Sequence, residues 1–67
     1  MNNLGTRIKE LRIEKGLSQS QLANVLYVSQ STVAYLECGK REPKASYIIA
    51  LVKYFEITYD EFFADIK

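Results

Sequence analysis

The chain has 67 residues, 48% of them hydrophobic and 25% charged, and its formal net charge is +1. A chain this short buries only about 60% of its unfolded surface, so we expect one domain over residues 1–67 with an economical helical core. It has no histidine and a single cysteine, Cys38, which excludes an internal disulfide and argues against a structural zinc site.

Helix starts are marked by a recurring signal, in which an apolar residue precedes a serine or threonine and a second apolar residue follows four positions later. The signal occurs at Leu17–Leu22, Val28–Val33 and Ile57–Phe62. The hydroxyl of such a residue accepts hydrogen bonds from first-turn amides, and the apolar pair forms a hydrophobic staple. Two starts also complete a capping box, Ser18 with Gln21 and Thr58 with Glu61.

Helix ends are marked by glycine and proline. Gly16 and Gly39 stand where a left-handed C-cap is expected, and Pro43 prevents the preceding helix from continuing. The sequence therefore predicts helices at about residues 4–15, 19–26, 30–38, 45–55 and 59–65. No stretch shows the alternation of a strand, so the predicted fold class is all-α.

Apolar residues at helical spacing predict a single core. Its expected members are Leu4, Ile8, Leu11, Leu22, Ala23, Leu26, Val33, Leu36, Ile48, Leu51, Val52, Phe55 and Phe62. Ala23 is the small member, and its size allows the second and third helices to approach closely.

Three spaced motifs connect the chain with a known family. They are LxxxxGLSQxxLA from Leu11 to Ala23, SQSTV from Ser29 to Val33, and LExGKRxP from Leu36 to Pro43. With them the chain resembles the Cro/C1-type helix-turn-helix repressors over nearly its whole length. The resemblance implies a compact five-helix, lambda-repressor-like DNA-binding domain, with the helix-turn-helix at its second and third helices. It also implies sequence-specific binding of double-stranded DNA as a transcriptional regulator, in the manner of a dimeric phage or bacterial repressor that occludes a promoter.

The third helix is expected to contact bases, since its first turn and one face are presented to the major groove. The candidates are Gln30, Ser31, Thr32, Ala34 and Tyr35. Glutamine can address adenine through N7 and N6, and an alanine methyl or an aromatic edge can meet a thymine methyl. The resemblance implies base contacts at Gln30, Ser31 and Tyr35. The alternative is a polar helix surface that touches nothing.

Phosphate contacts are expected at both ends of the helix-turn-helix, from Ser18, Gln19, Lys40, Arg41 and Lys44. Free amides and the helix dipole favour a phosphate where the second helix begins, and we expect Gln19 to be exposed there and Ser18 to serve also as the cap. The basic loop after the third helix would set register without reading sequence, unless it is only a solvated loop. The resemblance further implies a structural salt bridge between Arg12 and Glu37.

Two residues depart from the family pattern. Tyr27 stands in the turn where the family usually has glycine, because the backbone there prefers positive φ. A tyrosine that kept this conformation would cost about 1–2 kcal/mol. Cys38 stands where polar residues are common; we expect inert packing at the helix end, with oxidation near DNA as the alternative.

The charges and the surplus apolar residues predict two different surfaces. Residues 1–44 carry seven Lys/Arg against four acids, a balance of +3, whereas residues 45–67 carry two against four, a balance of −2. This division suggests one face toward a polyanion and one away from it, or else an uneven solvated surface. The last two predicted helices contain more apolar residues than one core-facing side requires. The surplus residues are Tyr47, Ile49, Tyr54, Tyr59 and Phe63.

These surplus residues suggest self-association, because a single small module buries too little surface for tight specific binding to DNA. We expect a homodimer contact at Tyr47, Tyr54, Tyr59 and Phe63. Such a dimer would bind a palindromic operator with half-sites about one helical turn apart. The alternatives are a fuller core or scattered exposed apolar groups, which are normal on monomers.

A protein-interaction module on the same fold, such as an antitoxin or an antagonist that masks a partner, is the alternative function. An enzyme is disfavoured, because the chain has no histidine, no nucleophile–base pair and no glycine-rich phosphate loop. We expect no cofactor, metal or small-molecule ligand. No apolar run approaches the roughly 20 residues that span a bilayer, so the expected setting is cytoplasmic, without a membrane partner.

Overall fold

The computed structural model describes residues 4–64, which form five α-helices and no strand. The helices are α1 (Leu4–Glu14), α2 (Gln19–Leu26), α3 (Gln30–Glu37), α4 (Ala45–Phe55) and α5 (Tyr59–Phe62). The all-α, five-helix prediction is confirmed. The bounds agree with the predicted ones to within one residue except at the end of α5, where Ala64 N–H donates to the Glu61 carbonyl and tightens the last turn. The predicted helix to residue 65 is therefore too long: residues 63 and 64 form a turn, and Asp65 lies outside the described residues.

All three predicted N-caps are present. The Ser18 hydroxyl accepts from the Gln21 amide at 3.0 Å, and the Gln21 side chain completes the capping box. Ser29 accepts from the Thr32 amide at 3.2 Å. Thr58 starts α5 with the second predicted capping box. The helices α2, α3 and α5 therefore begin where their local sequence signals predict. The N-cap residue of α4 makes no side-chain cap bond.

Four helix ends use the left-handed conformation, two of them without glycine. Gly16 and Gly39 have φ of 70° and 83°, as predicted. Tyr27, with φ 59°, keeps the left-handed turn despite its side chain, and Glu56, with φ 55°, adopts the same conformation without having been predicted to do so. At both ends the next residue is apolar and packs on the core, which satisfies the hydrophobic contact of a Schellman motif.

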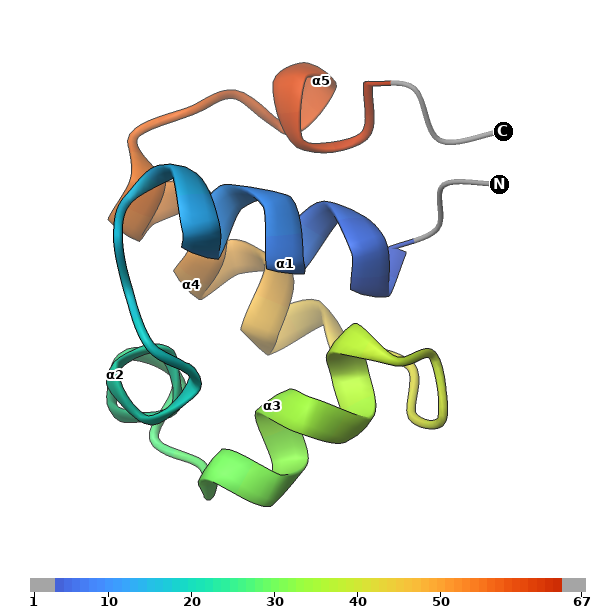
Figure 1. Ribbon diagram of the computed structural model, residues 1–67. Coiled ribbons are helices and arrows are strands. Elements are labelled where there is room, and N and C mark those ends of the chain that lie inside the picture. Colours follow the sequence, from blue (N-terminus) through green and yellow to red (C-terminus); the bar gives the residue numbers. More distant parts are fainter. Residues whose placement is uncertain (1–3, 65–67) are drawn as a thin grey trace.

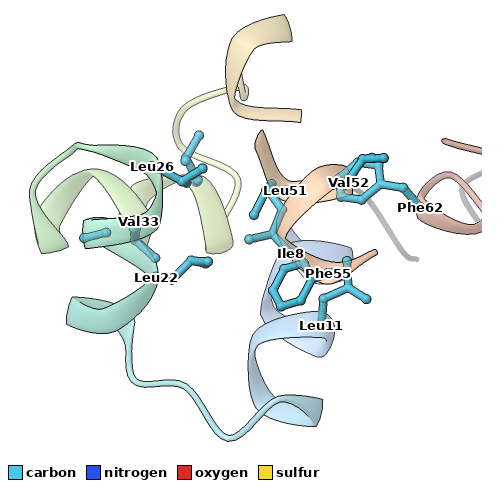
Figure 2. Packing of buried hydrophobic residues seen from close by; sticks show 11 residues of the cluster. Ile8, Leu11, Leu22, Leu26, Val33, Leu51, Val52, Phe55 and Phe62 are labelled. Atoms are coloured by element: carbon cyan, nitrogen blue, oxygen red, sulfur yellow. The ribbon is translucent and has the colours of Figure 1, made fainter. Parts of the chain in front are cut away.

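One apolar core joins all five helices. The buried side chains are Ile8, Leu11, Leu22, Ala23, Leu26, Val33, Leu36, Leu51, Val52, Phe55 and Phe62. Figure 2 shows Ile8 and Leu51 between the side chains of α2 and α3 on one side and Phe62 of α5 on the other. Leu4 and Ile48, also predicted for the core, are partly buried against it.

The helix-turn-helix forms one end of the molecule. In Figure 1, α2 and α3 lie below α1, and α5 lies at the opposite end. The short α5, which carries Asp60 and Glu61 in its first turn, thus lies at the end of the molecule opposite α3. No helix among residues 4–64 is long and apolar enough to span a membrane.

The short α5 contacts α1 through side-chain hydrogen bonds as well as through the apolar core. Arg7 donates from Nε to the Phe62 carbonyl at 3.1 Å and from Nη2 to the Glu61 carbonyl at 2.7 Å. A cation here satisfies carbonyls that a helix C-terminus leaves without intrahelical partners. The Phe62 ring is fully buried, so α5 is held at its end and along its apolar side.

Replacing Arg7 with alanine is expected to lower the free energy of unfolding by about 1–2 kcal/mol, because two carbonyls lose a charged donor. Amide hydrogen exchange in residues 59–64 should accelerate more than exchange in α2. Lys9→Ala removes an exposed cation from the same helix and is the matched control, expected to have little effect. Equal effects of the two variants would contradict the fastening role.

Candidate nucleic-acid interface

The solvent-facing side of α3 carries the predicted base-contacting residues. Gln30 and Ser31 in its first turn are exposed, and Tyr35 is exposed one turn later. Val33 and Leu36 occupy the opposite, fully buried side. The other two candidates are less accessible: Thr32 and Ala34 are half-buried, and the Thr32 hydroxyl lies 3.1 Å from the Ser29 hydroxyl in the cap.

A chain of hydrogen bonds joins α1, α2 and α3 beneath this surface. Arg12 donates from Nε to Glu37 Oε2 at 2.6 Å and from Nη2 to Glu37 Oε1 at 3.1 Å. Glu37 Oε1 also accepts from Gln19 Nε2 at 3.1 Å. Gln19 Oε1 in turn accepts from Gln30 Nε2 at 3.3 Å. The base-contacting candidate Gln30 is thus positioned through three other side chains.

The Arg12–Glu37 ion pair implied by the resemblance is present and is largely buried. The side chains are 13% and 4% exposed, and the hydrogen bond to Glu37 raises the pKa of Arg12 above its usual value. Arg12 also donates from Nη1 to the Leu17 carbonyl at 2.9 Å. No buried side-chain nitrogen or oxygen in residues 4–64 lacks a hydrogen-bond partner, so the pair meets the condition under which buried charges are tolerated.

Gln19 corrects one expectation. It was predicted to be exposed, but it is half-buried and its amide bonds to both Glu37 and Gln30. The reason is that Glu37 Oε1 has room for a second donor beside the guanidinium. Gln19 therefore supports Gln30, and its Nε2 keeps one further hydrogen that no described residue accepts.

The Gln30 amide retains the donor and acceptor that adenine requires. Its Nε2 donates one hydrogen to Gln19, and its Oε1 accepts from the Ser20 hydroxyl at 3.4 Å. Each atom has one remaining hydrogen or lone pair, which matches the N7 acceptor and N6 donor of adenine in the major groove. The role of Ser20 was not predicted, because nothing in the local sequence indicates a bond ten residues away.

The basic loop is tied to the end of α3. The Lys40 and Arg41 amides both donate to the Tyr35 carbonyl, at 3.0 and 3.3 Å. With the Tyr35 side chain, these residues line a shallow open depression of about 390 Å³. Lys44 lies elsewhere: it precedes α4, and its Nζ lies 5.8 Å from the centre of the Tyr47 ring. The structure thus groups Lys40 and Arg41 with Tyr35, whereas the contact it gives for the Lys44 side chain is with Tyr47.

Two further expectations are wrong. Cys38 is exposed instead of packed, because α3 ends one residue before it, and its thiol lies 3.5 Å from the Tyr35 carbonyl. Tyr47 is half-buried against the core, since it lies on the same side of α4 as Leu51, and so it is not surplus. The exposed apolar groups of α4, α5 and the turn after α5 are Ile49, Tyr54, Tyr59 and Phe63.

Taken together, these features define the class. Two capped helices separated by a three-residue connection, residues 27–29, present the first turn and one face of α3. Fixed side-chain amides support that face, and a basic loop follows it. This is the arrangement of a helix-turn-helix domain, in which the second helix of the motif is the one that enters the major groove.

The chain belongs to the Cro/C1-type helix-turn-helix family, since the sequence model of the family described as Helix-turn-helix matches residues 8–62. It is 38% identical over 55 residues to the HTH-type transcriptional activator BcrR of Enterococcus faecalis, covering 82% of this chain and 27% of BcrR. It is 30% identical over 60 residues to RstR, the transcriptional repressor of the cryptic phage CTXphi of Vibrio cholerae, covering 90% of this chain and 54% of RstR. The chain thus spans between about a quarter and half of these relatives.

Two solved structures resemble the fold. A transcriptional regulator from Listeria innocua has a TM-score of 0.85 at 31% identity, covering 97% of this chain and 61% of the regulator. The P22 c2 repressor, solved with a synthetic operator, has a TM-score of 0.80 at 24% identity, covering 92% of this chain and 94% of the repressor. The second likeness concerns the fold alone.

Proposed function

We propose that the chain binds double-stranded DNA sequence-specifically and regulates transcription, as a dimeric repressor that occludes a promoter. The observation that carries the proposal is Gln30, whose amide is fixed by Gln19 and Ser20 yet keeps a free donor and acceptor on the exposed side of α3. The family and the regulator relatives support the DNA-binding role. The phage repressor relative supports repression. Such a protein acts in the cytoplasm, where bacterial and phage DNA lies.

The contacts divide into two kinds. Gln30, Ser31 and Tyr35 would meet base edges, because they are the exposed side chains of α3. Lys40 and Arg41 would neutralise phosphates and fix register, because their loop is bonded to the end of the same helix. At the other end of the motif, the α2 N-terminus with Ser18 and Gln19 would hold a third phosphate.

The dimer is part of the proposal, since one module of this size buries too little surface for tight specific binding. Tyr54, Tyr59 and Phe63 are the candidates that remain exposed. They come from α4, α5 and the turn after α5, so the proposed contact lies away from the exposed face of α3. Two-fold pairing would make the operator palindromic.

Selection of bound duplexes from a random DNA pool, followed by titration at several salt concentrations, tests this function. The expected result is one preferred palindromic site and a steep decrease of affinity with salt. If the protein binds no duplex at low salt, the proposed function is contradicted. In that case the exposed aromatic groups of α4 and α5 favour the alternative, a protein-interaction module of the antitoxin or antagonist kind.

Gln30→Ala and Lys40→Ala should have different effects on binding. Gln30→Ala is expected to remove about 1–3 kcal/mol of preference at one base pair. Lys40→Ala should weaken binding to all sequences similarly and reduce the salt slope by about 1. Lys53→Ala, which removes an exposed cation from α4, is the matched control for the charge. The measurement is the dissociation constant on the selected site and on its single-base variants; identical behaviour of the first two variants would contradict the division of roles.

A further inference from the structure

Tyr27 is the most exposed large apolar residue in the described part of the chain. The residue is 94% exposed. Its side chain makes no hydrogen bond, ion pair or ring contact with any other described residue. The ring therefore contributes neither burial nor a polar contact to the folded domain.

The backbone at Tyr27 gives no reason for an aromatic side chain. The residue is left-handed, with φ 59° and ψ 42°, a conformation that glycine adopts without strain. Glu56 has the same conformation and the same pattern of cap hydrogen bonds at the end of α4. The two sites thus share their backbone requirement and differ in their side chain and surroundings.

The surroundings of Tyr27 are the beginning of α3. Tyr27 precedes the N-cap Ser29 by two residues, so their Cα atoms lie within about 7 Å of each other. Gln30 follows directly in the exposed first turn. Tyr27 therefore lies next to the N-terminal end of α3, and the Lys40 and Arg41 amides are bonded near the opposite end of the same helix.

We propose that Tyr27 is a DNA contact, whose phenolic hydroxyl donates a hydrogen bond to a phosphate oxygen beside the base pair that Gln30 contacts. Tyrosine is among the side chains that bind phosphate oxygens in protein–DNA complexes. The inference rests on the proposed DNA-binding function and extends it. With Tyr27 at one end of α3 and the basic loop at the other, the register of the helix along the groove is fixed at both ends. Because tyrosine is neutral, its contact releases no counterion.

Three variants on the selected duplex test the contact. Tyr27→Phe should weaken binding about three- to tenfold on the selected site and on its single-base variants alike, with an unchanged salt slope. Tyr27→Gly should weaken binding at least as much while raising the midpoint of thermal unfolding, because the strain is relieved. Glu56→Gly, the matched control, should raise the midpoint and leave binding unchanged.

Ethylation interference locates the phosphate. Ethylation of one phosphate next to the Gln30 base pair should impair binding of the unmodified protein but make no further difference to Tyr27→Phe. If the unmodified protein binds DNA and both Tyr27 variants bind it as tightly as the unmodified protein does, the contact is refuted and the proposed function stands. A loss in Tyr27→Gly without a loss in Tyr27→Phe also refutes the phosphate bond. If the unmodified protein binds no duplex at low salt, the proposed function fails first.

Discussion

Replacing Arg12 with leucine is expected to destabilise the domain by about 3–5 kcal/mol, the range found when one partner of a buried ion pair is removed. The Glu37 side chain is only 4% exposed, so its carboxylate would keep Gln19 as a neutral donor and lose both bonds from the guanidinium. Domains of this kind have a total stability of about 5–15 kcal/mol. Urea denaturation followed by circular dichroism measures the change.

The double variant Arg12→Leu/Glu37→Leu separates the ion pair from packing. Replacing both charges with apolar groups of similar size removes the unpaired carboxylate, so the double variant should be more stable than Arg12→Leu alone. The double variant should nevertheless bind DNA more weakly than the unmodified protein, because Gln19 loses the acceptor that positions it against Gln30. A double variant whose destabilisation equals the sum of the two single changes would contradict the buried pair.

Replacing Gly5 with alanine should destabilise the domain by about 3 kcal/mol, the upper part of the range for overpacking. Gly5 is buried on α1. A Cβ there would lie 2.9 Å from the Glu37 carbonyl oxygen and still closer to that of Leu36. Both obstacles are backbone atoms, which cannot rotate away, so α1 would have to move from the end of α3. Thermal and urea unfolding measure the loss.

Gly16→Ala is the control for this prediction. A Cβ at Gly16 meets nothing within 4 Å, but the residue has φ +70°, so its replacement costs only the left-handed strain of about 1–2 kcal/mol. In an unobstructed helix, replacing glycine with alanine stabilises by about 0.5–1 kcal/mol. A gain of that size from Gly5→Ala would show that α1 and α3 are not in close contact at this point.

The fold was largely predictable from the sequence because its signals are local. The caps at Ser18, Ser29 and Thr58 each depend on residues within one helical turn, and all three are present. The apolar spacing also identified the core. The left-handed end at Glu56 was not predicted, because no glycine marks it and only the packing of Ile57 on the core accompanies it.

The site was predictable only in part, because its arrangement depends on distances between helices. The exposed positions of Gln30, Ser31 and Tyr35 follow from the period of one helix. The half-buried state of Gln19 follows from the position of Glu37, a residue of another helix. The burial of Tyr47 likewise depends on how α4 lies on the core. Spacing along the chain contains neither kind of information.

The hydrogen-bond chain from Arg12 to Gln30 limits how such a domain can be re-engineered. A protein engineer who wants a new operator preference would naturally transplant the exposed residues of α3 alone. Here Gln30 is oriented by Gln19 on α2, which is oriented by Glu37, whose charge is balanced from α1. A graft that leaves Gln19 and Arg12 behind transfers the side chain without its alignment. Under the proposed function, a graft that preserves the orientation of Gln30 must therefore include the contacting residues of α1, α2 and α3.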